Sequence, residues 1–119
     1  MGRRARAHET MRAPNSDYKN AEGDTLTLRG SLTLGARHEY AQTLAGAERP
    51  AATREDAEQR ATELLFERLA VRWTIAGAPI ERQNDLLARL RAATPAERAW
   101  VRDVLREHCE EHFPDVKAP

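Results

Sequence analysis

The chain has 119 residues, of which 40% are hydrophobic and 21 are alanine, and its 19 basic and 19 acidic side chains cancel. This length fits one small domain with tails, and the alanine content leaves few large side chains for a core. The zero net charge argues against a general DNA-binding domain, which usually carries a basic excess. The sole cysteine excludes an internal disulfide. Since no apolar run approaches the ~18 residues of a membrane helix and no secretory signal is visible, we expect a cytoplasmic protein.

The first 22 residues show neither a helical nor a strand period and offer few groups that could be buried. The arginines of this N-terminal segment are Arg3, Arg4, Arg6 and Arg12. They could touch phosphate, but arginines without aromatics or a docking fold are common in tails. We therefore predict a disordered basic arm over residues 1–22, a single small helical domain with short strands over residues 23–114, and a tail over residues 115–119.

Residues 25–29 alternate between polar and apolar side chains, which predicts a short strand. Gly30 interrupts the run, and the following segment allows two interpretations. The strand either bends or bulges at Gly30, or it ends in a turn that leads to a helix capped by Thr33. In both cases residues 36–44 are expected to form a short helix.

A linker rich in Ala, Gly and Pro is predicted over residues 46–53, and the longest helix follows it. Thr53 has the features of an N-cap residue, because an acidic side chain lies three positions after it. Apolar residues then recur at helical spacing, which predicts an amphipathic helix over residues 54–70. The apolar stripe consists of Ala57, Ala61, Leu64, Leu65 and Leu69, widened by Phe66, Ala70 and Trp73.

Residues 71–75 alternate again and are rich in β-branched side chains, so they form either the frayed helix end or a short strand. We favour a strand that pairs antiparallel with residues 25–29. Residues 76–79 (Ala-Gly-Ala-Pro) are expected to form a turn after it.

The C-terminal third predicts two further helices. Residues 82–92 carry a compact leucine face, and Thr94 begins a capping box with a proline and a glutamate behind it, which predicts a helix over residues 95–113. Pro114 ends that helix. The expected fold is α+β and mainly helical, with three longer helices, a small antiparallel two-stranded pairing and the disordered arm.

His108 and His112 form the one cluster that could bind metal, since residues at i and i+4 leave a helix on one side. Their segment also matches the inverted zinc-protease pattern H-x-x-E-H. A catalytic zinc needs a third protein ligand, however, and only seven residues follow. Cys109 lacks an oriented base and an oxyanion hole, so a structural role is favoured. We predict no metal, no cofactor and no enzymatic activity.

Arg98, Arg102 and Arg106 are spaced by four and follow one face of the last helix. Like charges at this spacing repel by roughly 0.2–0.5 kcal/mol per pair. A solvated face shared with neighbouring acids is the favoured interpretation, and a docking stripe for an acidic partner is the alternative.

Taken in order, these elements resemble the tail assembly chaperones of long-tailed bacteriophages. The resemblance rests on the strand Thr25-Leu26-Thr27-Leu28-Arg29, the stretch Leu32-Thr33-Leu34-Gly35, the Trp strand Val71-Arg72-Trp73-Thr74-Ile75, the Gly-x-Pro turn before Ile80, and the Asp-Leu-Leu helix. It covers about residues 22–113 and leaves the basic arm out.

The resemblance implies a non-catalytic protein of the host cytoplasm that binds the helical tape measure protein and tail tube subunits during virion assembly. An amphipathic helix can be bound in an apolar groove of such a chaperone. The residues nominated for partner contact are Leu64, Leu65, Trp73, Leu86, Leu87, Leu90, Arg98, Trp100, Arg102 and Val104. Two alternatives remain: a small helical nucleic-acid-binding regulator that uses the arginine arm, and a small protein that binds metal through His108 and His112.

Overall fold

The computed structural model describes residues 14–45 and 51–119, which form a four-stranded antiparallel sheet and four helices. The strands lie in the order β1 (Ser16–Lys19), β2 (Thr25–Leu28), β3 (Ala70–Ile75) and β4 (Ala78–Ile80). The helices are α2 (Leu34–Leu44), α3 (Ala51–Leu69), α4 (Gln83–Arg91) and α5 (Pro95–His112). The α+β class is confirmed, but the predicted two-stranded pairing is only the centre of a larger sheet.

The predicted pairing of the two central strands is confirmed. β2 and β3 run antiparallel, with Leu26 opposite Trp73, and the register shifts between Thr27 and Leu28. The irregularity therefore lies inside the β2–β3 ladder and not at Gly30. The side chains of Leu26, Leu28 and Trp73 are buried, as the alternation requires.

The predicted disordered arm is wrong for the part of it that the structure describes. Residues 16–19 form β1, which pairs with β2 and places Tyr18 opposite Leu26. One apolar side chain in four residues gives no strand signal, but Tyr18 packs against the core once β2 is in place. Residues 1–13, which carry the four arginines of the arm, lie outside the described residues.

The turn predicted over residues 76–79 is shorter than expected. Only Ala76 and Gly77 turn the chain, both with positive φ (51° and 81°), and Ala78–Ile80 returns as β4 along β3. A two-residue hairpin of this kind needs positive φ at both positions. Pro79 is tolerated in β4 because this strand lies at the edge of the sheet.

The starts of α2 and α3 settle two predictions. The side chain of Thr33 accepts a hydrogen bond from the Ala36 amide (3.1 Å), so the interpretation with a turn and a capped helix is confirmed. The predicted cap at Thr53 is wrong, because α3 already begins at Ala51. Alanine is the strongest helix former, and the two alanines before Thr53 extend the helix over positions assigned to the linker. Residues 46–50 of that linker lie outside the described residues.

The last two helices agree with the prediction to within one residue at each end. At the start of α5 the capping box is complete: the Thr94 hydroxyl accepts from the Glu97 amide (3.1 Å), and the Glu97 carboxylate accepts from the Thr94 amide (2.9 Å). The helix ends at His112, before Phe113 and Pro114.

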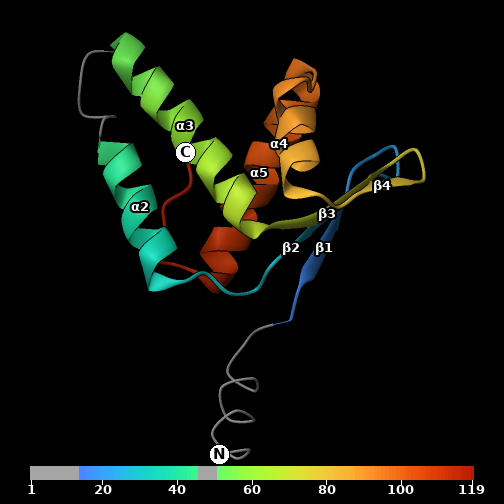
Figure 1. The fold of residues 1–119 in the computed structure, drawn as a ribbon, viewed down its shortest axis with the longest axis horizontal. Coiled ribbons are helices and arrows are strands. Elements are labelled where there is room, and N and C mark those ends of the chain that lie inside the picture. Colours follow the sequence, from blue (N-terminus) through green and yellow to red (C-terminus); the bar gives the residue numbers. More distant parts are fainter. Residues whose placement is uncertain (1–13, 46–50) are drawn as a thin grey trace, which may run out of the picture.

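The helices pack on one face of the sheet. α3 lies between α2 and α4 and runs directly into β3, with α5 behind it (Figure 1). The core gathers where these elements meet, and its largest enclosed side chains are Trp73, Phe66, Leu26, Leu28, Leu65, Leu69 and Leu105. On the other face Asp17, Thr27 and Arg72 share one register row, and the Thr27 hydroxyl donates to Asp17 (2.6 Å).

Candidate protein-docking groove

The ten residues nominated for partner contact divide into two groups of five. The first group belongs to the core, because its members are at most 4% exposed: Leu65, Trp73, Leu86, Leu90 and Val104. The second group is half-buried and reaches the surface: Leu64, Leu87, Arg98, Trp100 and Arg102. Only the second group can touch a partner without opening the fold.

A surface groove of about 640 Å³ lies between α2, α3 and α4 and brings two of these residues together. Leu64 of α3 and Leu87 of α4 supply its apolar lining. Apart from Ala45 at the end of α2, the remaining lining is polar or charged and comes from all three helices: Glu39, Gln42 and Thr43 on α2, Arg60, Glu63 and Glu67 on α3, and Arg91 on α4. The groove therefore has leucines between charged rims.

The rims are tied by ion pairs that join neighbouring helices. Arg91 of α4 binds Glu63 of α3 (2.8 Å), and Arg68 of α3 binds Glu39 of α2 (2.8 Å). Burial alone would raise the pKa of Glu63, but hydrogen bonds from Arg91 and Gln59 outweigh it and hold that pKa below its usual value. Exposed pairs of this kind contribute only about 0–1 kcal/mol each, so a charged partner can exchange them at little cost.

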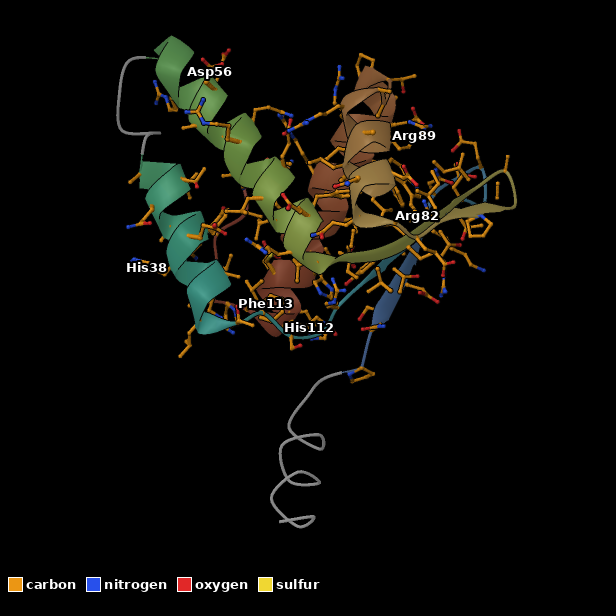
Figure 2. All side chains as sticks on the ribbon, viewed as in Figure 1. His38, Asp56, Arg82, Arg89, His112 and Phe113 are labelled. Atoms are coloured by element: carbon orange, nitrogen blue, oxygen red, sulfur yellow. The ribbon has the colours of Figure 1, made fainter. Side chains whose placement is uncertain are left out.

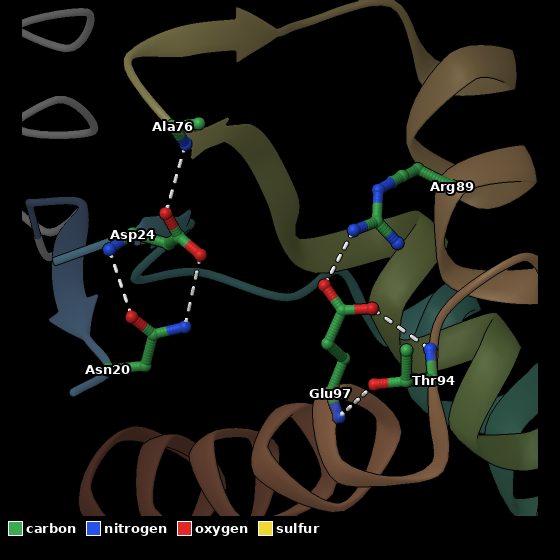
Figure 3. Close-up of polar contacts among 6 residues, drawn as sticks. All are labelled: Asn20, Asp24, Ala76, Arg89, Thr94 and Glu97. Carbon is green, nitrogen blue, oxygen red and sulfur yellow. Dashed lines mark hydrogen bonds and ion pairs between the residues drawn. The ribbon is translucent and has the colours of Figure 1, made fainter. Parts of the chain in front are cut away.

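A second cluster of side chains surrounds Trp73 and includes residues of α4 and α5. The Arg89 guanidinium lies over the Trp73 ring (5.2 Å to the centroid) and binds Glu97 (2.5 Å), which also completes the Thr94 capping box (Figure 3). The pKa of Glu97 is lowered chiefly by the hydrogen bond from Arg89 and next by the hydrogen bond from the Thr94 amide. Trp100 packs near Trp73 (6.5 Å between centroids). This cluster fastens α4 to α5 and explains why Trp73 is core and not surface.

The predicted arginine stripe is not a uniform surface. Arg102 donates to Gln59 of α3 (2.7 Å), and Arg106 binds Asp103 (3.2 Å) and donates to the main-chain oxygen of Pro119 (3.0 Å). Arg98 makes no ion pair with any residue that the structure describes. Two of the three arginines are therefore used to hold the fold, which leaves Arg98 as the arginine of the stripe best placed for a partner.

His108, the buried member of the histidine pair considered as a possible metal site, is engaged inside the protein. His108 is fully buried, and its Nε2 donates to the Arg29 main-chain oxygen (2.6 Å) while its Nδ1 accepts from the Tyr18 hydroxyl (2.7 Å). Both ring nitrogens are thus engaged and offer no lone pair to an ion. Burial, against the hydrogen bond to Arg29, lowers the pKa of His108.

The neighbours of His108 support a structural role. The His112 ring lies 4.5 Å from the His108 ring and next to Phe113, at the end of α5 (Figure 2). Burial, with Asp115 nearby, raises the pKa of the Cys109 thiol to about 11, which keeps it protonated and weakly nucleophilic. Within the described ranges, no group of three or more potential ligands from His, Cys, Asp and Glu could hold a metal.

Sequence reasoning missed the part of the groove contributed by α2. Glu39, Gln42 and Thr43 are polar, and helical periodicity reports only apolar stripes, so no pattern marks them.

Over residues 14–45 and 51–119, none of the helices combines the length and apolar character needed to cross a membrane. Comparison with known proteins found no protein-family model, curated protein or solved structure with a significant match to the chain.

Proposed function

We propose that this chain is a non-catalytic, tail assembly chaperone-like protein, which binds helical tape measure protein and tail tube subunits in the host cytoplasm during virion assembly. The resemblance of its strand, turn and helix motifs to those chaperones supports this role. The observation that carries the proposal is the groove between α2, α3 and α4, where Leu64 and Leu87 lie between charged rims.

The groove fits an amphipathic helix. Recognition of this kind needs an apolar strip to receive one helix face and polar rims to meet the flanking side chains. Leu64 and Leu87 supply the strip, and the pairs Arg91–Glu63 and Arg68–Glu39 supply charges of both signs on the rims. A partner helix would bury its apolar face against these two half-buried leucines. It would therefore remain soluble until assembly.

Co-expression with the tape measure and tail tube proteins encoded beside the gene tests the proposal. The chain should co-purify with the tape measure protein and raise its soluble fraction. The double variant Leu64→Asp and Leu87→Asp should reduce that fraction at least roughly tenfold, since it places two charges where the partner's apolar face must dock.

The matched control is Leu34→Asp. Leu34 is the one large hydrophobic side chain that is strongly exposed (83%) among the described residues, and it lies outside the groove lining. This variant should solubilise the partner as well as the unmodified chain does. If the unmodified chain neither co-purifies with these tail proteins nor keeps them soluble, the chaperone proposal is wrong.

A further inference from the structure

The last residues of the chain fold back over the molecule. After α5 ends, residues 114–119, called here the C-terminal strap, run between α2 and α3 in the view of Figure 1, to the left of α5. Val116 is only 6% exposed and joins the core, and Ala118 packs against it. A segment that sequence reasoning treats as a simple tail therefore fills a groove on the surface.

Side chains of α2 and α5 bind the strap as a receptor binds a peptide. Arg37 pairs with Asp115 (2.8 Å), and the Tyr40 hydroxyl donates to the main-chain oxygen of Lys117. On the α5 side, Arg106 donates to the main-chain oxygen of Pro119. These three contacts and the apolar site for Val116 define what the groove recognises: an acidic residue, a small apolar residue directly after it, and extended backbone oxygens.

The strap is held only at these points. Its one backbone–backbone hydrogen bond within the described chain joins the Val116 amide to the Phe113 oxygen, so the backbone of no other helix or strand secures it. Asp115 and Lys117 are exposed, and the Arg37–Asp115 pair is partly exposed to solvent, where such pairs are weak. Segments with few buried contacts open more readily than the core does.

We propose that the strap occupies a peptide-binding groove, from which an extended partner segment carrying an acidic residue followed by valine can displace it. Such a segment would reproduce the contacts with Arg37 and Tyr40 and place its valine where Val116 lies. The site lies apart from the leucine groove between α2, α3 and α4, so this inference does not depend on the proposed helical partner. In this proposal the strap is an internal competitor of an extended partner segment.

The tether sets how strongly the strap competes. A segment attached to its site by a short link acts at an effective concentration of roughly millimolar. In the unmodified chain a free peptide therefore binds weakly, and weakening the strap should expose the groove to it. This difference between the chain with and without a competent strap is the property to measure.

The experiment measures binding of a fluorescein-labelled peptide with the strap sequence Pro-Asp-Val-Lys-Ala-Pro to the full chain, by fluorescence anisotropy. Val116→Asp in the chain removes the apolar anchor, so the peptide should bind at least roughly tenfold more tightly than to the unmodified chain. Tyr40→Phe added to that variant should weaken the peptide again, because a donor to the peptide backbone is lost. A peptide with aspartate in place of its valine should not bind.

A second variant covers the case in which Val116→Asp does not fold. Asp115→Arg sets two guanidinium groups against each other at an exposed position, so it weakens the strap without disturbing the core, and should tighten peptide binding roughly fivefold. Folded variants that bind the peptide no more tightly than the unmodified chain overturn the proposal. Concentration-dependent dimerisation of Asp115→Arg without peptide binding also overturns it, since the occupant is then a second copy of the chain.

Discussion

One face of α3 packs into a closed core toward the sheet, whereas the face that carries Glu63, Leu64 and Glu67 borders the groove toward α2. Near the C-terminal end Phe66 and Leu69 are fully enclosed, and Phe66 meets Trp73 of β3 edge-on (5.9 Å between centroids). Farther from the sheet, the enclosed side chains of α3 are the small Ala57 and, near the middle of the helix, Ala61. Since apolar burial contributes in proportion to area, cohesion is concentrated at the sheet end of the molecule.

The difference explains where binding surfaces can exist. At the sheet end, large side chains and a hydrogen-bonded ladder fix the structure. At the open end, formed by α2 and the strap, Tyr40 and Val116 join the core, but the remaining attachments are exposed ion pairs and single hydrogen bonds, such as Arg68–Glu39 and Arg37–Asp115. A partner can therefore rearrange the contacts of α2 and the strap without disturbing the core at the sheet end.

The largest expected effect tests the closed end. Trp73→Ala should lower the free energy of unfolding by about 3–5 kcal/mol, as expected for a large aromatic side chain removed from a core. The neighbouring Trp100→Ala should have a smaller effect, because Trp100 is only half-buried. Urea unfolding followed by circular dichroism measures both. An unchanged midpoint for Trp73→Ala would show that the core does not depend on Trp73.

The next prediction concerns pH and the buried histidine that joins β1, β2 and α5. The pKa of folded His108 lies below the ordinary 6.5, so the unfolded chain binds a proton first as pH falls. The contribution of neutral His108 is thus complete above about pH 6.5 and is lost as pH falls toward the folded pKa. Urea midpoints between about pH 8 and about pH 5 should decline accordingly.

Matched histidine variants isolate that effect. His108→Gln cannot titrate, so it should be less stable overall but lose the decline with pH. His38→Gln replaces an exposed histidine on α2, at the open end, and should leave the decline unchanged. The same slope in His108→Gln as in the unmodified chain would assign the pH dependence to other groups, among which Glu111, Glu107 and His112 lie nearest to this network.

Helix caps provide a smaller, paired comparison of the two ends. Thr94→Ala removes the capping box of α5 and should lower stability by about 1 kcal/mol. Thr33→Ala removes a single cap bond from α2 (3.1 Å), where we expect local fraying of the helix and a smaller shift of the global midpoint. Urea unfolding gives the global effect, and amide hydrogen exchange gives the local one. Equal global losses in the two variants would argue against the distinction between a fixed and an open end.

The sequence predicts the parts of the fold that local chemistry determines. Helical periodicity and the Thr94 capping box locate α4 and α5, and alternation locates β2 and β3, because each signal depends on neighbouring residues. β1 escapes detection, since only Tyr18 among its four residues is apolar and its place is set by β2 and His108. The groove escapes for the same reason: Leu64 and Leu87 carry a helical signal, but the approach of α2 depends on tertiary packing.

The β3–β4 hairpin, whose second strand was also unexpected, supplies the smallest predicted effect. Ala76 has a φ of 51°, a left-handed conformation that side chains other than those of Gly, Asn and Asp rarely adopt. Asp24 holds this turn in place by accepting a hydrogen bond from the Ala76 amide (3.0 Å), and Asn20 donates to the other Asp24 oxygen (3.3 Å; Figure 3). The turn therefore keeps a strained residue that another side chain would fit better.

Ala76→Asn should raise the free energy of unfolding by about 0.5–1 kcal/mol, because Asn-Gly is the preferred pair for a two-residue hairpin of this type. The matched control is Gly77→Ala. Beyond the two neighbouring residues in the chain, no heavy atom lies within 4 Å of the added methyl group, so only its positive φ (81°) opposes the change, and stability should fall by about 1 kcal/mol. Urea unfolding distinguishes the two signs. Because the hairpin belongs to the fixed end of the molecule, the gain from Ala76→Asn should leave partner solubilisation and peptide binding unchanged; a loss of either would mean that binding draws on the sheet as well.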